Sequence, residues 1–189
     1  MNGYEKRTQQ KRNDILNAAF ETISLVPIQD VSIQDIAKRA HVSHVTIYNL
    51  FGSKTGLLDE AAKECADHDI KEILDVLKSD SPVQKRLRLY FAVSFQHSVD
   101  RPQFQPLMNY IFHDKNSSLC KYVTAQYAIT VPYLEKLYDD GQKAGIIRPS
   151  LTAQQFMKLL DICTRINRRF LLDDAMRETI TDCVFRCFS

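Results

Sequence analysis

The stretch VSHVTIYNLFGSK, residues 42–54, directly follows the segment SIQDIAKRA at 32–40. It sets five polar or aromatic side chains within seven residues: Ser43, His44, Thr46, Tyr48 and Asn49. A helix that serves only to fill a core does not need so many hydrogen-bonding groups on one side. The stretch therefore predicts a short helix whose outward side is presented to something outside the protein.

Signals for helix ends surround this stretch. Ser32 and Ser43 each stand where an N-cap is expected, and Gly52 is expected to end the second helix. Only His41 and Val42 connect the two helices. Two short helices joined by so tight a turn, with a third packed on them, form a helix-turn-helix. The second helix of this motif places its N-terminal residues against base edges in the major groove of DNA.

Hydrophobic periodicity predicts helices along almost the whole chain, and only five glycines and six prolines interrupt it. The first helix is expected to end near Pro27, and Pro132 is expected to kink or restart a helix that runs from about 118 to 143. We therefore predict an all-α fold with two domains. Residues 1–55 form a three-helix DNA-binding head, and residues 56–189 form a second, all-helical domain.

Charge is weak evidence for the same partner. The chain has a formal net charge of +2, and the seven basic and five acidic residues up to Thr55 account for that excess. The basic residues near the N-terminus, Lys6, Arg7, Lys11 and Arg12, fit a solvated helix end and a phosphate-contacting arm about equally well.

Other classes of protein find little support. The chain shows no nucleophile elbow, glycine-rich phosphate loop or HExxH motif, so we expect no enzyme and no cofactor. His68, His97 and His113 lack tight ligand spacing, so we expect no metal site. The sequence shows no signal peptide and no run long enough to span a membrane. Its five cysteines show no CxxC pair and are expected as reduced thiols, so we expect the protein in the cytoplasm.

The pattern Ile36-Ala37, Val42-Ser43, Thr46-Ile47-Tyr48, Phe51, Ser53-Lys54 and Leu57-Leu58, preceded by ILNAAFETI, resembles the tetracycline-repressor (TetR) family of bacterial transcription regulators. The resemblance covers roughly residues 10–60. By it, Thr46, Tyr48 and Lys54 match positions that contact the DNA backbone. His44, Val45 and Asn49 match positions that read bases, and Val45 or the Thr46 methyl group is placed to meet a thymine methyl. The whole DNA-binding set is Ser32, Ser43, His44, Val45, Thr46, Tyr48, Asn49 and Lys54.

One position departs from the family. His41 stands where the family has a glycine in the turn, and that position is expected to need a positive φ. Histidine tolerates this conformation better than a β-branched residue, so we expect a cost in stability and an intact motif.

The resemblance also implies that residues 56–189 are a ligand-binding and dimerisation domain. Its partners are a small-molecule effector of unknown identity and a second copy of the chain, giving a homodimeric repressor on double-stranded operator DNA. The expected effector-binding residues are Tyr90, Phe91, Phe95, Tyr110 and Tyr127, although simple core packing is the stronger explanation for any one of them taken alone. The expected dimer interface is Phe156, Leu159, Leu160, Cys163, Ile180 and Val184. Arg165, Arg168 and Arg169 fit a solvated dimer edge better than a site for an anionic effector. The alternative is a helical dimer that binds a small molecule or a protein and has lost DNA binding through His41.

Overall fold

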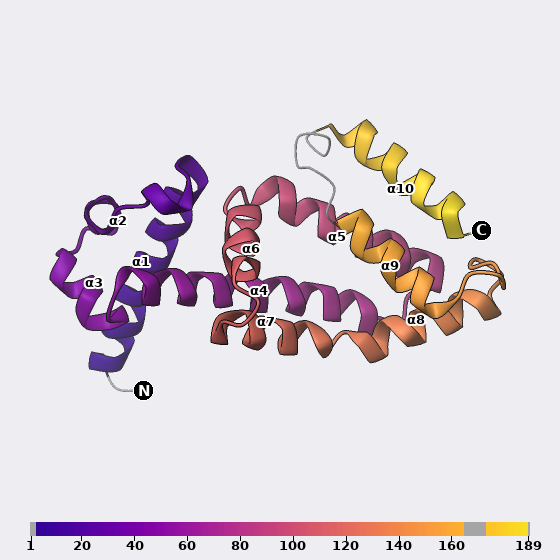
Figure 1. The fold of residues 1–189 in the computed structure, drawn as a ribbon, viewed down its shortest axis with the longest axis horizontal. Coiled ribbons are helices and arrows are strands. Elements are labelled where there is room, and N and C mark those ends of the chain that lie inside the picture. Colours follow the sequence, from indigo (N-terminus) through magenta and orange to yellow (C-terminus); the bar gives the residue numbers. More distant parts are fainter. Residues whose placement is uncertain (1–2, 165–172, 189) are drawn as a thin grey trace. The chain divides into compact units, whose positions relative to one another are not determined.

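A computed structural model describes residues 3–164 and 173–188 of the chain, and its described residues are helical with no strand (Figure 1). The predicted all-α fold is confirmed. The elements are α1 (Gly3–Leu25), η1 (Ile28–Asp30), α2 (Ile33–Arg39), α3 (His44–Phe51), α4 (Lys54–Lys78), α5 (Val83–Asp100), α6 (Phe104–His113), α7 (Ser118–Ala128), α8 (Val131–Lys143), α9 (Ala153–Thr164) and α10 (Asp174–Phe188).

The helix ends lie where local signals placed them. α1 ends at Leu25, two residues before Pro27. Pro132 lies in the first turn of α8, where a proline costs no helical hydrogen bond, so α7 and α8 are separate helices as expected. Within the described ranges no helix has the length and apolarity that crossing a membrane requires.

The chain divides into two compact units. The first contains the described residues of Met1–Ala66 and Pro102–Val123, and the second contains those of Asp67–Arg101 and Thr124–Ser189. This division differs from the predicted boundary between residues 55 and 56. α4 continues through that point, and α6 packs against η1 in the first unit. A DNA-binding module that ends at residue 55 stays a prediction.

The first unit has a core of aliphatic side chains. α1 packs on α2, and α2 packs on α3. The buried residues at their contacts are Ile15, Ala19 and Ile23 from α1, Ile36 and Ala37 from α2, and Ile47 and Phe51 from α3. Most of the free energy that holds these short helices together comes from this burial, because isolated helices of seven or eight residues are unstable in water.

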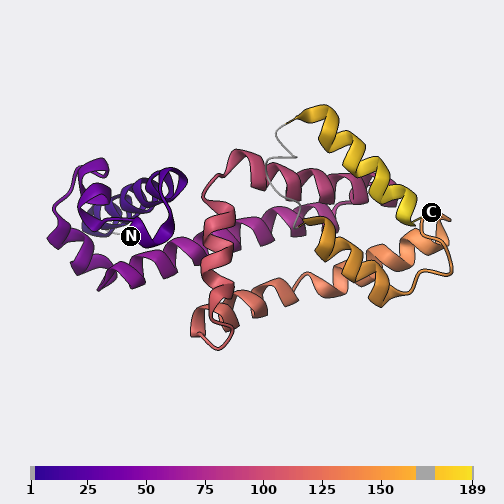
Figure 2. The same cartoon turned by 45° about the horizontal axis from the view of Figure 1, so that its top comes forward.

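The second unit has an aromatic core. α9 and α10 lie along α5 in both views (Figure 1 and Figure 2), and α8 packs on α5 and α9. The Phe188 ring stacks on Phe91 with ring centroids 6.1 Å apart and lies 5.3 Å from Phe156. Each of these three side chains is fully buried.

Candidate nucleic-acid interface

The turn between α2 and α3 is built from three backbone hydrogen bonds. Ala40 N donates to Ile36 O at 2.9 Å, His41 N to Lys38 O at 3.3 Å, and Val42 N to Ala37 O at 3.0 Å. The last two are the bonds of a Schellman motif, which ends a helix by placing the residue after the C-cap in the left-handed region. That residue is His41, with φ of 53°, so the predicted positive φ is confirmed.

α3 is capped at both ends by its own sequence. Ser43 Oγ accepts a hydrogen bond from Thr46 N at 3.1 Å and lies 2.9 Å from Thr46 Oγ1. Gly52, with φ of 75°, ends the helix and donates its N–H to Tyr48 O at 2.8 Å. These caps fix where α3 starts and stops, and they support the prediction made from Ser43 and Gly52.

The two sides of α3 differ sharply. Ile47 and Phe51 are buried against the rest of the first unit, whereas Val45 is 53% exposed and Tyr48 45%. His44 and Asn49 are exposed as well. The rings of His44 and Tyr48 meet edge to face, with centroids 6.5 Å apart, so each limits the orientations of the other. The exposed side therefore carries an imidazole, a branched aliphatic group, a phenol and an amide.

Arg12 fixes the far end of α3. Its guanidinium donates to Leu50 O at 2.8 Å, lies 4.6 Å above the Phe51 ring and pairs with Glu60. The first contact satisfies a carbonyl that the end of the helix leaves open. Sequence reasoning left Arg12 between a solvated residue and a phosphate contact. The structure gives it a third role, a link between α1, α3 and α4.

Two further predicted DNA contacts lie beside this helix. Ser32 is the N-cap of α2, and its Oγ accepts from Gln34 N at 3.2 Å. Lys54 begins α4, and its Nζ donates to Gln29 O at 3.1 Å. Ser53 Oγ caps α4 by accepting from Gly56 N at 2.9 Å. Both predicted residues are half-buried and hold local structure in the free protein.

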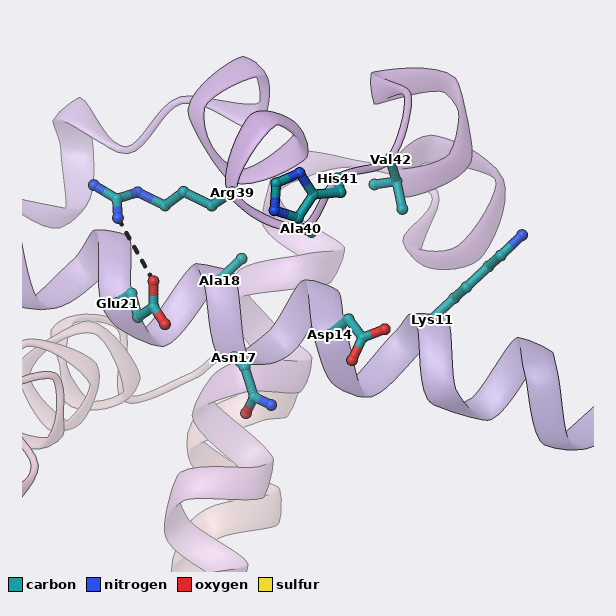
Figure 3. Close-up of a pocket in the computed structure, with 9 residues that line it drawn as sticks. All are labelled: Lys11, Asp14, Asn17, Ala18, Glu21, Arg39, Ala40, His41 and Val42. Atoms are coloured by element: carbon teal, nitrogen blue, oxygen red, sulfur yellow. Dashed lines mark ion pairs between the residues drawn. The ribbon is translucent and has the colours of Figure 1, made fainter.

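A groove of about 490 Å³ lies between α1 and the turn (Figure 3). The figure shows Lys11 and Arg39 toward opposite ends and His41 between them, and Arg39 pairs with Glu21 at 3.5 Å. The carboxylate of Asp14 adds a second acidic group to the lining. Because acidic and basic groups are mixed there, the groove by itself does not mark a phosphate site.

The five predicted effector residues do not fall in one unit. Tyr110 belongs to the first unit, where it donates to Asp59 Oδ1 at 2.8 Å, and burial together with that carboxylate raises the pKa of Tyr110. The other four belong to the second unit. Tyr90, Phe91 and Phe95 are buried in its core, and burial raises the pKa of Tyr90.

Tyr127 belongs to a polar network that sequence reasoning missed. Its hydroxyl donates to Asp69 Oδ2 at 2.6 Å, and the other oxygen of Asp69 contacts His97 Nδ1. His97 Nε2 contacts Glu72, which also accepts from Arg101 at 2.9 Å. Burial alone raises the pKa of Glu72, but the hydrogen bonds from His97 and Arg101 lower it below its ordinary value. Among the described residues no group of His, Cys, Asp and Glu has an arrangement that holds a metal ion.

Four of the six predicted dimer residues are core residues of the single chain. Phe156, Leu160, Cys163 and Val184 are buried within it, and burial raises the pKa of the Cys163 thiol to about 11. Packing within the chain already accounts for their burial, so their place in a dimer interface stays a prediction. Hydrophobic periodicity does not show which surface covers a side chain. Leu159 and Ile180 are half-buried. The three arginines predicted at a solvated dimer edge, Arg165, Arg168 and Arg169, lie outside the described residues.

Comparisons with known proteins agree with this geometry. The sequence model of the family described as "Bacterial regulatory proteins, tetR family" matches residues 15–61, which contain α2 and α3. The chain is 36% identical over 75 residues to the uncharacterized HTH-type transcriptional regulator YvdT of Bacillus subtilis, which is 40% of this chain and 39% of that protein. It is 30% identical over 128 residues to the HTH-type transcriptional regulator BetI 1 of Chromohalobacter salexigens, which is 58% of this chain and 63% of the relative. The chain thus matches less than two thirds of the length of either relative.

A solved structure extends the similarity in fold. AibR, in complex with isovaleryl coenzyme A and operator DNA, superposes with a TM-score of 0.67 at 19% identity. The match covers 94% of this chain and 97% of that one. At this identity the likeness concerns the fold alone.

Proposed function

Since the chain belongs to the tetR family of bacterial regulatory proteins, we propose that it is a homodimeric transcriptional repressor that a small-molecule effector releases from operator DNA. The observation that carries the proposal is the exposed side of α3. α3 is the second helix of the helix-turn-helix, the helix that this motif places in the major groove. Its exposed side presents hydrogen-bonding groups and one aliphatic group, as contacts with base edges require.

The residues expected to contact DNA divide by chemistry into two kinds of contact. Tyr48 and Lys54 carry a phenol hydroxyl and an ammonium group, which suit phosphate oxygens. Lys54 also stands at the N-terminus of α4, where backbone N–H groups favour an anion. His44, Val45 and Asn49 face outward from α3 and suit base edges. Ser32, Ser43 and Thr46 take part in the caps that position the two helices, and we expect them to contact the backbone of the duplex.

A second copy would double these contacts. The candidate dimer surface includes four of the apolar side chains that remain exposed or half-buried on the last two described helices. These four are Leu159 and Ile162 on α9 and Met176 and Ile180 on α10, with Ile162 64% exposed. Their spacings of three and four residues align each pair on one side of its helix. Two-fold symmetry then predicts an operator with half-sites about 34 Å apart or a multiple of that distance.

Effector release requires a site in the second unit whose occupation changes the helices of the first. α4 contributes Lys54–Ala66 to the first unit and Asp67–Lys78 to the second, so a shift along it is communicated by covalent structure. The polar network at Asp69, Glu72 and His97 begins three residues beyond the first unit's last residue in α4. A coupling free energy of about 1–3 kcal/mol is typical of such switches.

DNA binding is the first test. Duplexes that span the DNA flanking the protein's own gene are titrated by fluorescence anisotropy at several salt concentrations. Lys54→Gln is expected to weaken binding to every duplex alike and to reduce the slope of log Kd against log salt by about two, because the dimer loses one phosphate contact in each of its two subunits. His44→Ala is expected to change which duplex is preferred. Unchanged affinity, preference and salt slope in both variants would contradict the assignment.

The alternative of a module that has lost DNA binding depended on His41 disturbing the turn. The complete Schellman hydrogen bonds around His41 remove that reason. Native mass spectrometry of the protein purified from cells tests the rest of the proposal, since it reports both the dimer and any bound small molecule. A chain that stays monomeric at every concentration contradicts the homodimer.

A further inference from the structure

α3 presents one aliphatic side chain to its surroundings. Of its apolar residues, Ile47 and Phe51 are buried and Leu50 is half-buried. Val45 is exposed over more than half of its surface, although it lies in the first turn of the helix, the part that approaches base edges most closely. The major groove offers a single apolar feature for such a group, the 5-methyl of thymine.

Thr46 is the other residue with a methyl group in this turn, and its surroundings set it apart. Its hydroxyl lies 2.9 Å from Ser43 Oγ, and its N–H donates to the same oxygen at 3.1 Å. These two bonds hold the side chain toward the N-cap, and it is half-buried. Thr46 therefore stabilises the start of the helix, while Val45 has no such local role.

The neighbours of Val45 restrict what it can meet. His44 and Tyr48 are engaged with each other through their rings, one turn apart. Asn49 lies one turn after Val45 on the same exposed side. One helical turn advances about 5.4 Å, and one base pair advances about 3.4 Å along a strand. Val45 and Asn49 therefore face base pairs that are one or two steps apart.

We propose that Val45 determines sequence specificity by packing against the 5-methyl group of a thymine in each half-site, an inference that rests on the proposed function. Asn49 then reads the base one or two pairs away, where an adenine matches its amide through N6 and N7. The ligand class is thus a duplex whose half-sites each carry a thymine opposite Val45. The contact is apolar, so it adds discrimination between bases without adding to the salt dependence of binding.

The test uses duplexes that the full-length protein selects from a random double-stranded library. Each thymine of the selected half-sites is replaced in turn by deoxyuridine, which removes only the methyl group, and Kd is measured by fluorescence anisotropy. At one position per half-site the wild-type protein is expected to bind about fourfold more weakly, and about 15-fold more weakly when both half-sites are changed. Val45→Ala is expected to reduce this effect to less than about twofold.

Thr46→Ser is the matched control, because it removes the threonine methyl and keeps the hydroxyl that bonds Ser43. This variant is expected to retain the full response to deoxyuridine. The proposal is overturned if Thr46→Ser loses the response while Val45→Ala keeps it, if no thymine position responds, or if the selected half-sites contain no shared thymine. In all three cases DNA is still bound and the proposed function stands. A library from which the protein selects no duplex overturns the proposed function and this inference together.

Discussion

Replacing His41 by glycine is expected to stabilise the first unit, although glycine usually destabilises a folded protein. His41 adopts φ of 53° in the Schellman turn after α2, a region that a residue with a Cβ atom enters at a cost. The same motif ends α8, where Gly145 N donates to Gln142 O at 3.0 Å and Ile146 N to Gly141 O at 2.9 Å. There the equivalent residue is Gly145, with φ of 69°.

The size of the effect follows from two opposing terms. Left-handed conformation costs an ordinary residue about 1–2 kcal/mol. Glycine removes that cost but has more conformational freedom in the unfolded chain, which opposes folding by about 0.4–1 kcal/mol. Because His41 is exposed, its ring contributes little packing. The net expectation is an increase of about 0.5–1 kcal/mol in the free energy of unfolding, or a rise in Tm of about 1–4 °C.

Thermal unfolding followed by circular dichroism measures the change, with Ala40→Gly as the matched control. Ala40 precedes His41 but has φ of −77°, a conformation that costs a residue with a Cβ atom nothing. Glycine at this position therefore relieves no backbone strain, and only the greater conformational freedom of the unfolded chain acts on stability. Ala40→Gly is expected to lower stability by about 0.5–1 kcal/mol. If His41→Gly lowers stability as much as Ala40→Gly does, the left-handed turn is not a source of strain and the reasoning is refuted.

Three further outcomes follow from the same structure. Gly145→Ala forces a residue with a Cβ atom into the left-handed region and is expected to destabilise the protein by about 1 kcal/mol in urea unfolding. An unchanged stability would contradict the left-handed conformation of residue 145. Arg86→Met removes the partner of Asp140, a 2.7 Å ion pair whose arginine side chain is 10% exposed, and is expected to cost about 1–3 kcal/mol. The control Arg88→Met breaks an exposed ion pair with Asp182 and is expected to lower the free energy of unfolding by less than about 1 kcal/mol. Equal losses in the two variants would be evidence that burial does not make the Arg86–Asp140 pair more important than an exposed pair. The lowered pKa of Glu72 means that its carboxylate contributes stability above its ordinary pKa, and this contribution disappears as pH falls through the lowered value. Glu72→Gln is therefore expected to make the free energy of unfolding fall less steeply as the pH is lowered. If the free energy of unfolding of the variant depends on acid pH as that of the wild type does, the network around His97 makes no contribution to stability in this pH range.

Local signals in the chain predicted the helices and the motif well, because each acts over a few residues. Ser32 and Ser43 bond N–H groups two and three residues ahead. His41 was expected to need a positive φ from its place in the turn, and the backbone has it. Pro132 separates two helices by the geometry of its own ring. Such effects need no knowledge of the rest of the fold.

Hydrophobic periodicity marked Phe156 and Leu160 on α9 as covered side chains, and the structure buries both within the chain. Phe156 and Leu160 show the same spacing whether they face their own core or a second copy of the chain. Hydrophobic periodicity reports that a side is covered and carries no information on which surface covers it. Tyr110 and Tyr127 were likewise grouped by residue type, and the two belong to different units.

The sequence by itself determined the helix-turn-helix, its caps and its outward-facing residues, since capping and backbone preferences act within about four residues of the chain. The tertiary structure alone decided the role of Arg12, whose partners Leu50 and Glu60 lie 38 and 48 residues away, and the meeting of His97 with Asp69 across 28 residues. Contacts at such separations depend on how whole helices pack, and packing is set by the sum of many weak burial energies that no short stretch of sequence contains.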